Sequence, residues 1–188
     1  MSAPIREVAL RLIEEAAADP RGVVPIVCAG DPVLRTAAPA YDGQLAAGEL
    51  AALLAVMDRT LRAAPGVGLA APQIGLSVAL AVVADPLADP ARERTVVPFR
   101  VLINPRYEVV DGEAAAFAEG CLSVPGYAAV VARHRRVRLV GQDERGVALD
   151  EELVGWPARI VQHETDHLAG TLYLDKADLR SLAVASGF

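Results

Sequence analysis

Two histidines and a glutamate near the C-terminal end of the chain have the spacing of a metal site. His163 and His167 are four residues apart, and Glu164 directly follows the first of them. Residues four apart on a helix share one face, so both imidazoles can bind the same ion. Glu164 can then reach a water held in an open coordination position and act as a general base. Two buried core histidines would be the alternative, but the whole chain has only three histidines.

A catalytic site of this kind requires a third protein ligand. The familiar metallopeptidases take it from downstream, but no Glu or His follows His167, and Tyr173 occupies the position of the third histidine in the longer motif. Only Asp175 and Asp178 remain downstream. We therefore expect an upstream ligand, and a cysteine is favoured because thiolates bind such metals strongly. The upstream candidates are Cys28, Cys121, His134 and several carboxylates.

Two glycine-containing segments carry further polar candidates. One is GVGLAAPQ at 66–73, which ends in Gln73, and the other is EGCLS at 119–123, which contains Cys121. A glycine beside Cys121 leaves room for a metal or a substrate to approach the backbone. Taken singly, the first segment is explained by a loop that needs glycine, and Cys121 is as well explained by a buried, inert thiol.

Together, the three segments resemble the signature motifs of the peptide deformylases, G-x-G-L-A-A-x-Q, E-G-C-L-S and H-E-x-D-H. All three motifs are matched in full and in order. Residues 30–35 and 102–105 are also similar to family segments, so only about the first twenty residues and the last dozen fall outside the resemblance. Membership would make the chain a metal-dependent hydrolase of protein biosynthesis. It would remove the formyl group from the N-terminal formyl-methionine of nascent polypeptides and release formate.

The resemblance implies a role for each motif residue. Glu164 would accept a proton from the attacking water and pass it to the leaving amine. Gln73, through its side-chain amide, and Leu122, through its backbone N–H, would stabilise the oxyanion. The implied metal ligands are Cys121, His163 and His167. The implied cofactor is one divalent ion, Fe(II) in the cell, with zinc, nickel or cobalt as substitutes.

Substrate contacts are expected on the glycine segments and on the histidine helix. The backbone groups expected to hold the peptide as an added strand are those of Val67, Gly68 and Gly120. We hypothesise that Trp156 and Ile160, on the same helix face as the first histidine, line the methionine pocket. Plain core packing explains these two residues nearly as well.

Two positions depart from the family pattern. Family members often have Val-Pro-Arg where this chain has Val131-Ala132-Arg133, and several have Arg at the position of Ala128. These departures concern recognition of the peptide backbone and leave the metal ligands unchanged. Asp166 is not needed as a ligand, and we hypothesise that it pairs with Arg133 and braces the helix.

The apolar pattern predicts a fold with helices at both ends of the chain and strands between them. Helices are expected at 4–17, 45–64 and 153–168, with Pro157 in the first turn of the last helix and Gly170 just past its end. Short β-type runs are expected between the second and third helices. Two of these runs, 96–103 and 107–110, should be separated at Asn104-Pro105, and 119–125 should be irregular.

Strands that do not alternate regularly with helices indicate an α+β fold. We expect antiparallel or mixed sheets packed around a central metal-binding helix. The chain has 188 residues, which suits one domain with one hydrophobic core. The expected catalytic domain spans 1–188, and residues 1–20 form an N-terminal helical extension.

Charge and composition limit the partners. The net charge of −6 argues against a nucleic-acid partner, and the basic run at 133–136 is more simply a solvated strand or turn. No apolar stretch is long enough to span a membrane, the N-terminal segment lacks the features of a signal peptide, and two distant cysteines make no disulfide framework. We expect a cytoplasmic monomer that acts on N-formylmethionyl peptides and nascent chains near the ribosome exit.

Two other functions compete with this interpretation. A zinc endopeptidase would use Asp175 or Asp178 as its third ligand, but this leaves Cys121 and Gln73 without a role. A non-catalytic metal-binding or ribosome-associated module would be expected to have lost Glu164 or Gln73, and both are present.

Overall fold

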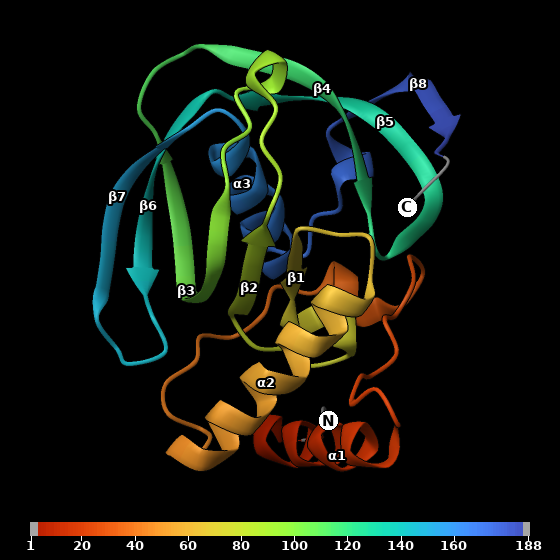
Figure 1. The fold of residues 1–188 in the computed structure, drawn as a ribbon, viewed down its shortest axis with the longest axis vertical. Helices are drawn as coiled ribbons and strands as arrows, with labels where there is room; N and C mark the ends of the chain where they lie inside the picture. The colour runs from red at the N-terminus through yellow and green to blue at the C-terminus, as the bar shows by residue number, and fades with distance from the viewer. Residues whose placement is uncertain (1–3, 186–188) are drawn as a thin grey trace.

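Two antiparallel sheets surround one helix in the computed structural model, which describes residues 4–185 (Figure 1). The helices in this part of the chain are α1 (Ile5–Ala18), α2 (Ala47–Ala63) and α3 (Trp156–Leu168). The strands are β1 (Gly68–Ala70), β2 (Leu80–Asp85), β3 (Val97–Val109), β4 (Ala114–Cys121), β5 (Val124–His134), β6 (Arg136–Gln142), β7 (Ala148–Val154) and β8 (Ala177–Val184). The predicted α+β class with a central helix is confirmed.

Both sheets contact α3, and each has an edge strand, β1 in one and β4 in the other. One sheet has the order β1-β2-β3-β6-β7 and the other has the order β4-β5-β8, with every pairing antiparallel. The helix α3 packs against strands of both sheets. Because β1 and β4 are both edge strands, each has backbone groups available to pair with another extended chain.

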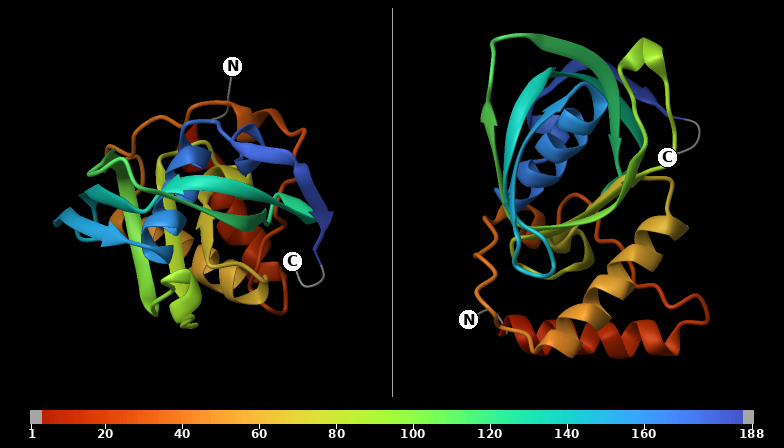
Figure 2. Two further views of the ribbon diagram at one scale, coloured as in Figure 1. Left: turned by 90° about the horizontal axis from the view of Figure 1, so that it is seen from above. Right: turned by 60° about the vertical axis from the view of Figure 1, so that its left-hand side comes forward.

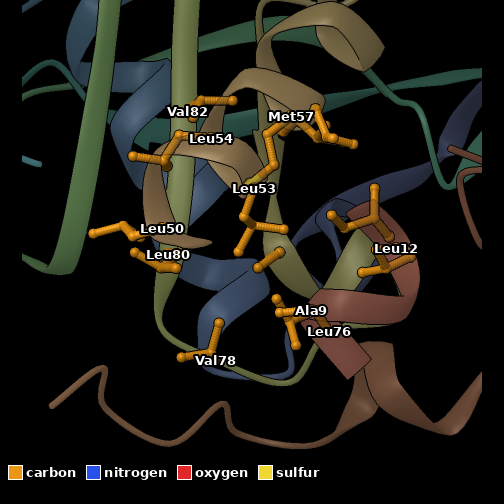
Figure 3. Packing of buried hydrophobic residues seen from close by; sticks show 14 of the residues in the cluster. Ala9, Leu12, Leu50, Leu53, Leu54, Met57, Leu76, Val78, Leu80 and Val82 are labelled. Atoms are coloured by element: carbon orange, nitrogen blue, oxygen red, sulfur yellow. The ribbon is translucent and has the colours of Figure 1, made fainter. Parts of the chain in front are cut away.

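Strand β2 is buried on both faces and divides the core in two. Leu80 and Val82 point to one face and pack with α2, whereas Ala81 and Val83 point to the other and pack with Ile160 of α3. This alternation follows from the two-residue period of a strand. Figure 3 shows Leu80 and Val82 among the leucines of α2. The core on the α2 side thereby supports the sheet that carries α3 on its opposite face.

The N-terminal helix α1 packs on α2, on the side of the molecule away from α3 (Figure 2). Its buried residues are Ala9, Leu12 and Ala16, and Arg6 pairs with Glu49 of α2. The prediction of a helix in this segment is confirmed. Within residues 4–185, no helix is both long and apolar enough to cross a membrane.

The third helix begins later than the sequence pattern predicted. Residues from Ala148 to Val154 form β7, which pairs along its length with β6, and α3 starts only at Trp156. Gly155 separates the two elements with a φ of 69°, a value that L-residues rarely adopt. The predictions for the two ends of this helix are confirmed, since Pro157 lies in its first turn and Gly170 follows its end with a φ of 76°.

Two further predictions of local structure need correction. Residues 119–125 do contain an irregularity, a register shift between Gly120 and Cys121, but they belong to a hairpin of β4 and β5 in which Cys121 pairs with Val124. Residues 97–109 form one strand and not two, with an irregularity where Asn104 adopts a φ of 50°. The Asn104 side chain accepts a hydrogen bond from Tyr41 N and donates one to Tyr41 O, each at 2.8 Å, and these bonds hold the irregularity in place.

Candidate active site

Three potential metal ligands meet where α3 approaches the end of β4. His163 and His167 lie one turn apart on α3, and Cys121 is the last residue of β4. Their ligand atoms all lie within 4.8 Å of one another, and Cys121 Sγ is 3.2 Å from His167 Nε2. This is the only such His/Cys/Asp/Glu group among residues 4–185, and the other upstream candidates, Cys28 and His134, are not part of it.

Both downstream aspartates have other partners. Asp175 pairs with Arg35 and accepts a hydrogen bond from the Leu172 N–H at 2.8 Å. Asp178 accepts a hydrogen bond from the Arg180 N–H at 3.0 Å, within β8. The ligand arrangement of a zinc endopeptidase is therefore absent from the described residues.

The donor atoms fit a divalent transition metal. Two imidazole nitrogens and one thiolate suit Fe(II), Zn, Ni or Co, and three protein ligands leave a coordination position for water. His163 Nδ1 lies 3.2 Å from a carboxylate oxygen of Glu119. A hydrogen bond to this carboxylate fixes the proton on Nδ1 and directs Nε2 toward the other two ligands, as carboxylates beside metal-binding histidines commonly do.

Glu119 also anchors a buried ion network behind the histidines. Arg133 donates to both oxygens of Glu119 at 2.7 and 2.9 Å and to Asp166 at 2.7 Å, and Arg159 makes a further ion pair with Glu119. Burial alone would raise the pKa of Glu119, but hydrogen bonds from His163 and Arg133 outweigh burial and hold the pKa well below its usual range. The predicted pair between Asp166 and Arg133 is confirmed.

The departures from the family pattern leave this network intact. Arg133 is buried and fully paired although Ala132 precedes it. Ala128 lies in β5 opposite Gly120 of β4.

Glu164 lies beside the ligand cluster with an unsatisfied carboxylate. It is 3% exposed, and its Oε2 has no hydrogen-bond partner among the described residues. Burial raises the pKa of Glu164 to about 7, although the charges of His163 and Arg133 lower it in part. A carboxyl group with this pKa can both accept and return a proton near neutral pH.

Close packing of β1 against α3 positions Glu164. A Cβ atom added at Gly68 would lie 2.1 Å from Glu164 Oε1, which is far inside van der Waals contact. The motif glycine at this position is therefore required for the carboxylate to reach the site.

Gln73 is oriented so that its amide N–H groups face the same cluster. Its Oε1 accepts a hydrogen bond from Ala70 N at 2.8 Å, and its Nε2 lies 3.6 Å from Cys121 Sγ and 3.3 Å from Ser123 Oγ. Because the Ala70 N–H donates a hydrogen bond to the amide, the atom that it contacts is the oxygen, and the NH₂ group points the other way, toward Cys121. Leu122 follows Cys121 in the turn between β4 and β5.

A cavity of about 300 Å³ opens onto these groups. The predicted site residues that line it are Gln73, Cys121, Leu122, His163, Glu164, Val67, Gly68, Gly120, Trp156 and Ile160. The eleventh, His167, lies behind this surface and is 1% exposed. The edge strands β1 and β4 contribute Gly68 and Gly120 to its lining.

Three arginines that the sequence did not single out also line the cavity. They are Arg92 and Arg94, from the loop between β2 and β3, and Arg159 from α3. The loop looked like an ordinary polar connection because it contains prolines and charges without any motif. The approach of Arg92 and Arg94 to Trp156 leaves no signal in sequence spacing, since Trp156 is more than sixty residues further along the chain. Arg159 is only three residues after Trp156, on the same helix.

One thiolate and two imidazole donors meet here beside a buried carboxylate of raised pKa and an oriented amide. Together these groups define a metal-dependent hydrolase site. The model of the polypeptide deformylase family matches residues 23–182, and the chain belongs to that family. It is an enzyme that hydrolyses the formyl group from the N-terminal formyl-methionine of nascent polypeptides and releases formate.

Individual relatives agree with this assignment. The chain is 60% identical over 167 residues to peptide deformylase 3 of Streptomyces avermitilis. The matched region covers 86% of this chain and 75% of that protein. It is 53% identical over 165 residues to the peptide deformylase of Bifidobacterium adolescentis, covering 85% of this chain and 75% of that protein. A crystal structure of a Synechococcus elongatus peptide deformylase in complex with actinonin matches with a TM-score of 0.73 and 35% identity, covering 84% of this chain and 80% of that one.

Proposed function

We propose that this deformylase binds one divalent metal ion through Cys121, His163 and His167 and uses Glu164 to carry the proton. The observation that carries the proposal is the meeting of the three ligand atoms, within 4.8 Å of one another, in a cavity that Glu164 also lines. We propose Fe(II) as the ion in the cell, with zinc, nickel or cobalt as substitutes, since this donor set suits all four. When bound, the ion would supply Lewis acidity that makes a water molecule acidic enough to react near neutral pH.

Glu164 would move the proton. Its carboxylate accepts a proton from the attacking water as the new bond to the formyl carbon forms. The same carboxyl group then donates that proton to the nitrogen of the leaving amine as the C–N bond breaks. Its pKa of about 7, which burial raises from the usual range, supports both halves of this cycle.

Two neutral donors would stabilise the negative charge that develops on the formyl oxygen. One is the side-chain amide of Gln73, whose N–H groups face Cys121. The other is the backbone N–H of Leu122, in the adjacent turn. Donors held in place before the reaction lower the barrier without reorganising during it.

The substrate would bind as an extended strand between β1 and β4. The backbone groups we assign to this pairing are those of Val67, Gly68 and Gly120, which line the cavity. Trp156 and Ile160 would contact the methionine side chain. A formyl group is smaller than any internal peptide unit, so a narrow cavity admits the chain end and excludes internal peptide bonds.

We propose that the enzyme works as a cytoplasmic monomer on nascent chains near the ribosome exit. A thiolate ligand and Fe(II) both require a reducing compartment, which supports this location. The basic run at 133–136 does not suggest nucleic-acid binding, because Arg133, Arg135 and Arg136 all pair with carboxylates. We further propose that the catalytic domain spans 1–188, with 1–20 as an accessory extension that includes α1.

Formate release measures this function directly. The assay would use Fe(II)-loaded enzyme and a formyl-Met-Ala-Ser peptide under anaerobic conditions, and it would compare the parent chain with Glu164→Ala and Cys121→Ala. We expect rapid formate release from the parent, loss of activity with retained metal in Glu164→Ala, and loss of both in Cys121→Ala. Robust activity in Glu164→Ala would contradict the assigned proton carrier.

A further inference from the structure

The cavity carries an arginine cluster with no direct role in the proposed metal binding or proton transfer. We call Arg92, Arg94 and Arg159 the arginine lip. All three line the cavity, although the chain as a whole has a net charge of −6. A cation at such a cavity attracts negatively charged groups to the extent that no carboxylate of the protein already neutralises it.

The three guanidinium groups of the arginine lip surround one indole ring. Their central carbons lie 5.7, 5.5 and 5.6 Å from the Trp156 ring centroid for Arg92, Arg94 and Arg159. Guanidinium groups at this distance from an aromatic face are attracted by its quadrupole. Trp156 therefore holds the arginine lip beside the proposed binding position of the methionine side chain.

Two members of the arginine lip are already neutralised. Arg94 makes two hydrogen bonds of 2.7 Å to the fully buried Asp85. Arg159 is 5% exposed and forms an ion pair with Glu119. Neither can approach a substrate carboxylate without breaking a buried pair, which would be strongly unfavourable.

Arg92 differs from its two neighbours in both exposure and pairing. Its side chain is 47% exposed, and the nearest carboxylate, that of Asp89, is 3.7 Å away and itself 44% exposed. Such a solvent-screened contact is weak and can be exchanged for another carboxylate. Arg92 is therefore the member of the arginine lip that can bind an incoming anion.

The backbone around Arg92 is tied to the catalytic helix. The next residue, Glu93, has a φ of 51°, and its carbonyl accepts a hydrogen bond from Trp156 N at 3.1 Å. Its carboxylate accepts hydrogen bonds of 3.0 and 2.8 Å from Arg135 Nε. These contacts hold Arg92 at a defined place relative to α3, so less ordering is needed when a ligand binds.

We propose that Arg92 determines specificity by binding the carboxylate of an Asp or Glu side chain in the first or second residue after the formyl-methionine. The inference rests on the proposed function, in which Trp156 contacts the methionine. An extended peptide leaving that position passes the cavity rim, where Arg92 is the partly exposed cation. Peptides with acidic residues there are preferred over neutral ones, and neutral ones over those with Lys.

The test compares kcat/KM for formyl-Met-Ala-Ser-amide with its Asp and Lys variants at the second and third positions. The parent chain, Arg92→Gln and Arg92→Glu are measured beside Arg138→Gln, a matched control that is also 47% exposed but does not line the cavity. A formyl-Met-Ala-Ser peptide with a free C-terminus distinguishes a terminal carboxylate from a side chain. Calorimetric binding of the deformylated products gives a readout independent of turnover.

We expect an acidic-to-neutral ratio of about two to five in the parent, the range for a partly exposed charge pair, and a decline of this ratio with added salt. The ratio should fall to about one in Arg92→Gln, reverse in favour of Lys in Arg92→Glu, and stay unchanged in Arg138→Gln. Equal ratios in all four proteins would overturn the role of Arg92, as would a preference confined to the free C-terminus. Failure to release formate from any peptide would instead contradict the proposed function itself.

Discussion

At the scale of single residues, the proposed catalysis relies on side chains that are buried without being fully paired. Glu164 is 3% exposed and has one carboxylate oxygen with no partner in the described part of the chain. Gln73 is 1% exposed, and its N–H groups are directed at Cys121 by a backbone bond to its oxygen. Buried polar groups with unused capacity are costly for stability, and active sites are where such groups are retained.

Replacement of Gln73 by Ala should slow the chemical step. We expect kcat to fall about 100- to 1,000-fold, the usual effect of losing one oxyanion donor. Metal content should remain at the parent level, because the ligand set of Cys121, His163 and His167 is unchanged. Formate release and metal analysis on the same preparation check both statements, and an unchanged kcat would remove Gln73 from the oxyanion site.

Replacement of Gly68 by Ala should displace Glu164, the proposed general base. The added methyl group would lie 2.1 Å from Glu164 Oε1, so the carboxylate must move. A shift of about 1 Å in a catalytic group can cost about 100-fold in rate, and we expect a loss of kcat of that order. Gly112→Ala is the control, since a Cβ there meets nothing within 4 Å and should leave kcat unchanged.

At the scale of elements, the active site is held together by the contacts between α3 and the β4–β5 hairpin. Arg133 of β5 joins Glu119 of β4 to Asp166 of α3, and Glu119 in turn orients His163. The thiolate is brought to the histidines by the same hairpin, because Cys121 ends β4 at its turn. The distances between the proposed metal ligands therefore depend on a buried ion network, which contacts His163 through Glu119 and Arg133.

Loss of Arg133 should destabilise the fold. In Arg133→Met, Glu119 and Asp166 lose their shared cation but keep Arg159 and Lys176 as partners. We expect the free energy of unfolding to fall, by less than the about 3–5 kcal/mol that follows when a buried charge is left without any partner. Arg138→Met removes an exposed arginine from its pairs with Asp150 and Glu108 and should change stability little. Urea denaturation of both variants at constant pH makes the comparison, and equal midpoints would argue against a structural role for the network.

Local sequence signals were most informative for features that depend on one secondary-structure element alone. The His163–His167 spacing, Pro157 and Gly170 correctly indicated the helix and its end. The start of this helix was misplaced because residues 148–154 are a strand only through pairing with β6. The role of Glu119 was missed for the same reason, since its contacts with His163 and Arg133 join segments far apart in the sequence.

At the scale of the whole molecule, the proposed substrate selection follows from two edge strands that border one cavity. Strands β1 and β4 belong to different sheets, and both border the cavity of about 300 Å³. The end of an extended peptide can pair with such edge strands. An internal peptide bond has further residues on both sides of its carbonyl, and the cavity would have to accommodate both. The composition of the chain carried no information about this geometry.

This geometry predicts that the enzyme does not act as an endopeptidase. Incubation of the metal-loaded enzyme with an unformylated peptide of about twenty residues should leave it intact. The same peptide carrying an N-terminal formyl group should lose the mass of that group and nothing more. Mass spectrometry distinguishes the two products, and internal fragments from either peptide would contradict the proposed size selection.

The central claim is that one metal ion is bound by a thiolate and two imidazoles. X-ray absorption spectroscopy of the zinc-loaded protein tests this claim most directly. We predict one sulfur at about 2.3 Å and two imidazole nitrogens at about 2.0–2.1 Å, with the sulfur contribution absent in Cys121→Ala. A parent spectrum with only nitrogen and oxygen neighbours, or a sulfur contribution that persists in Cys121→Ala, would contradict the account.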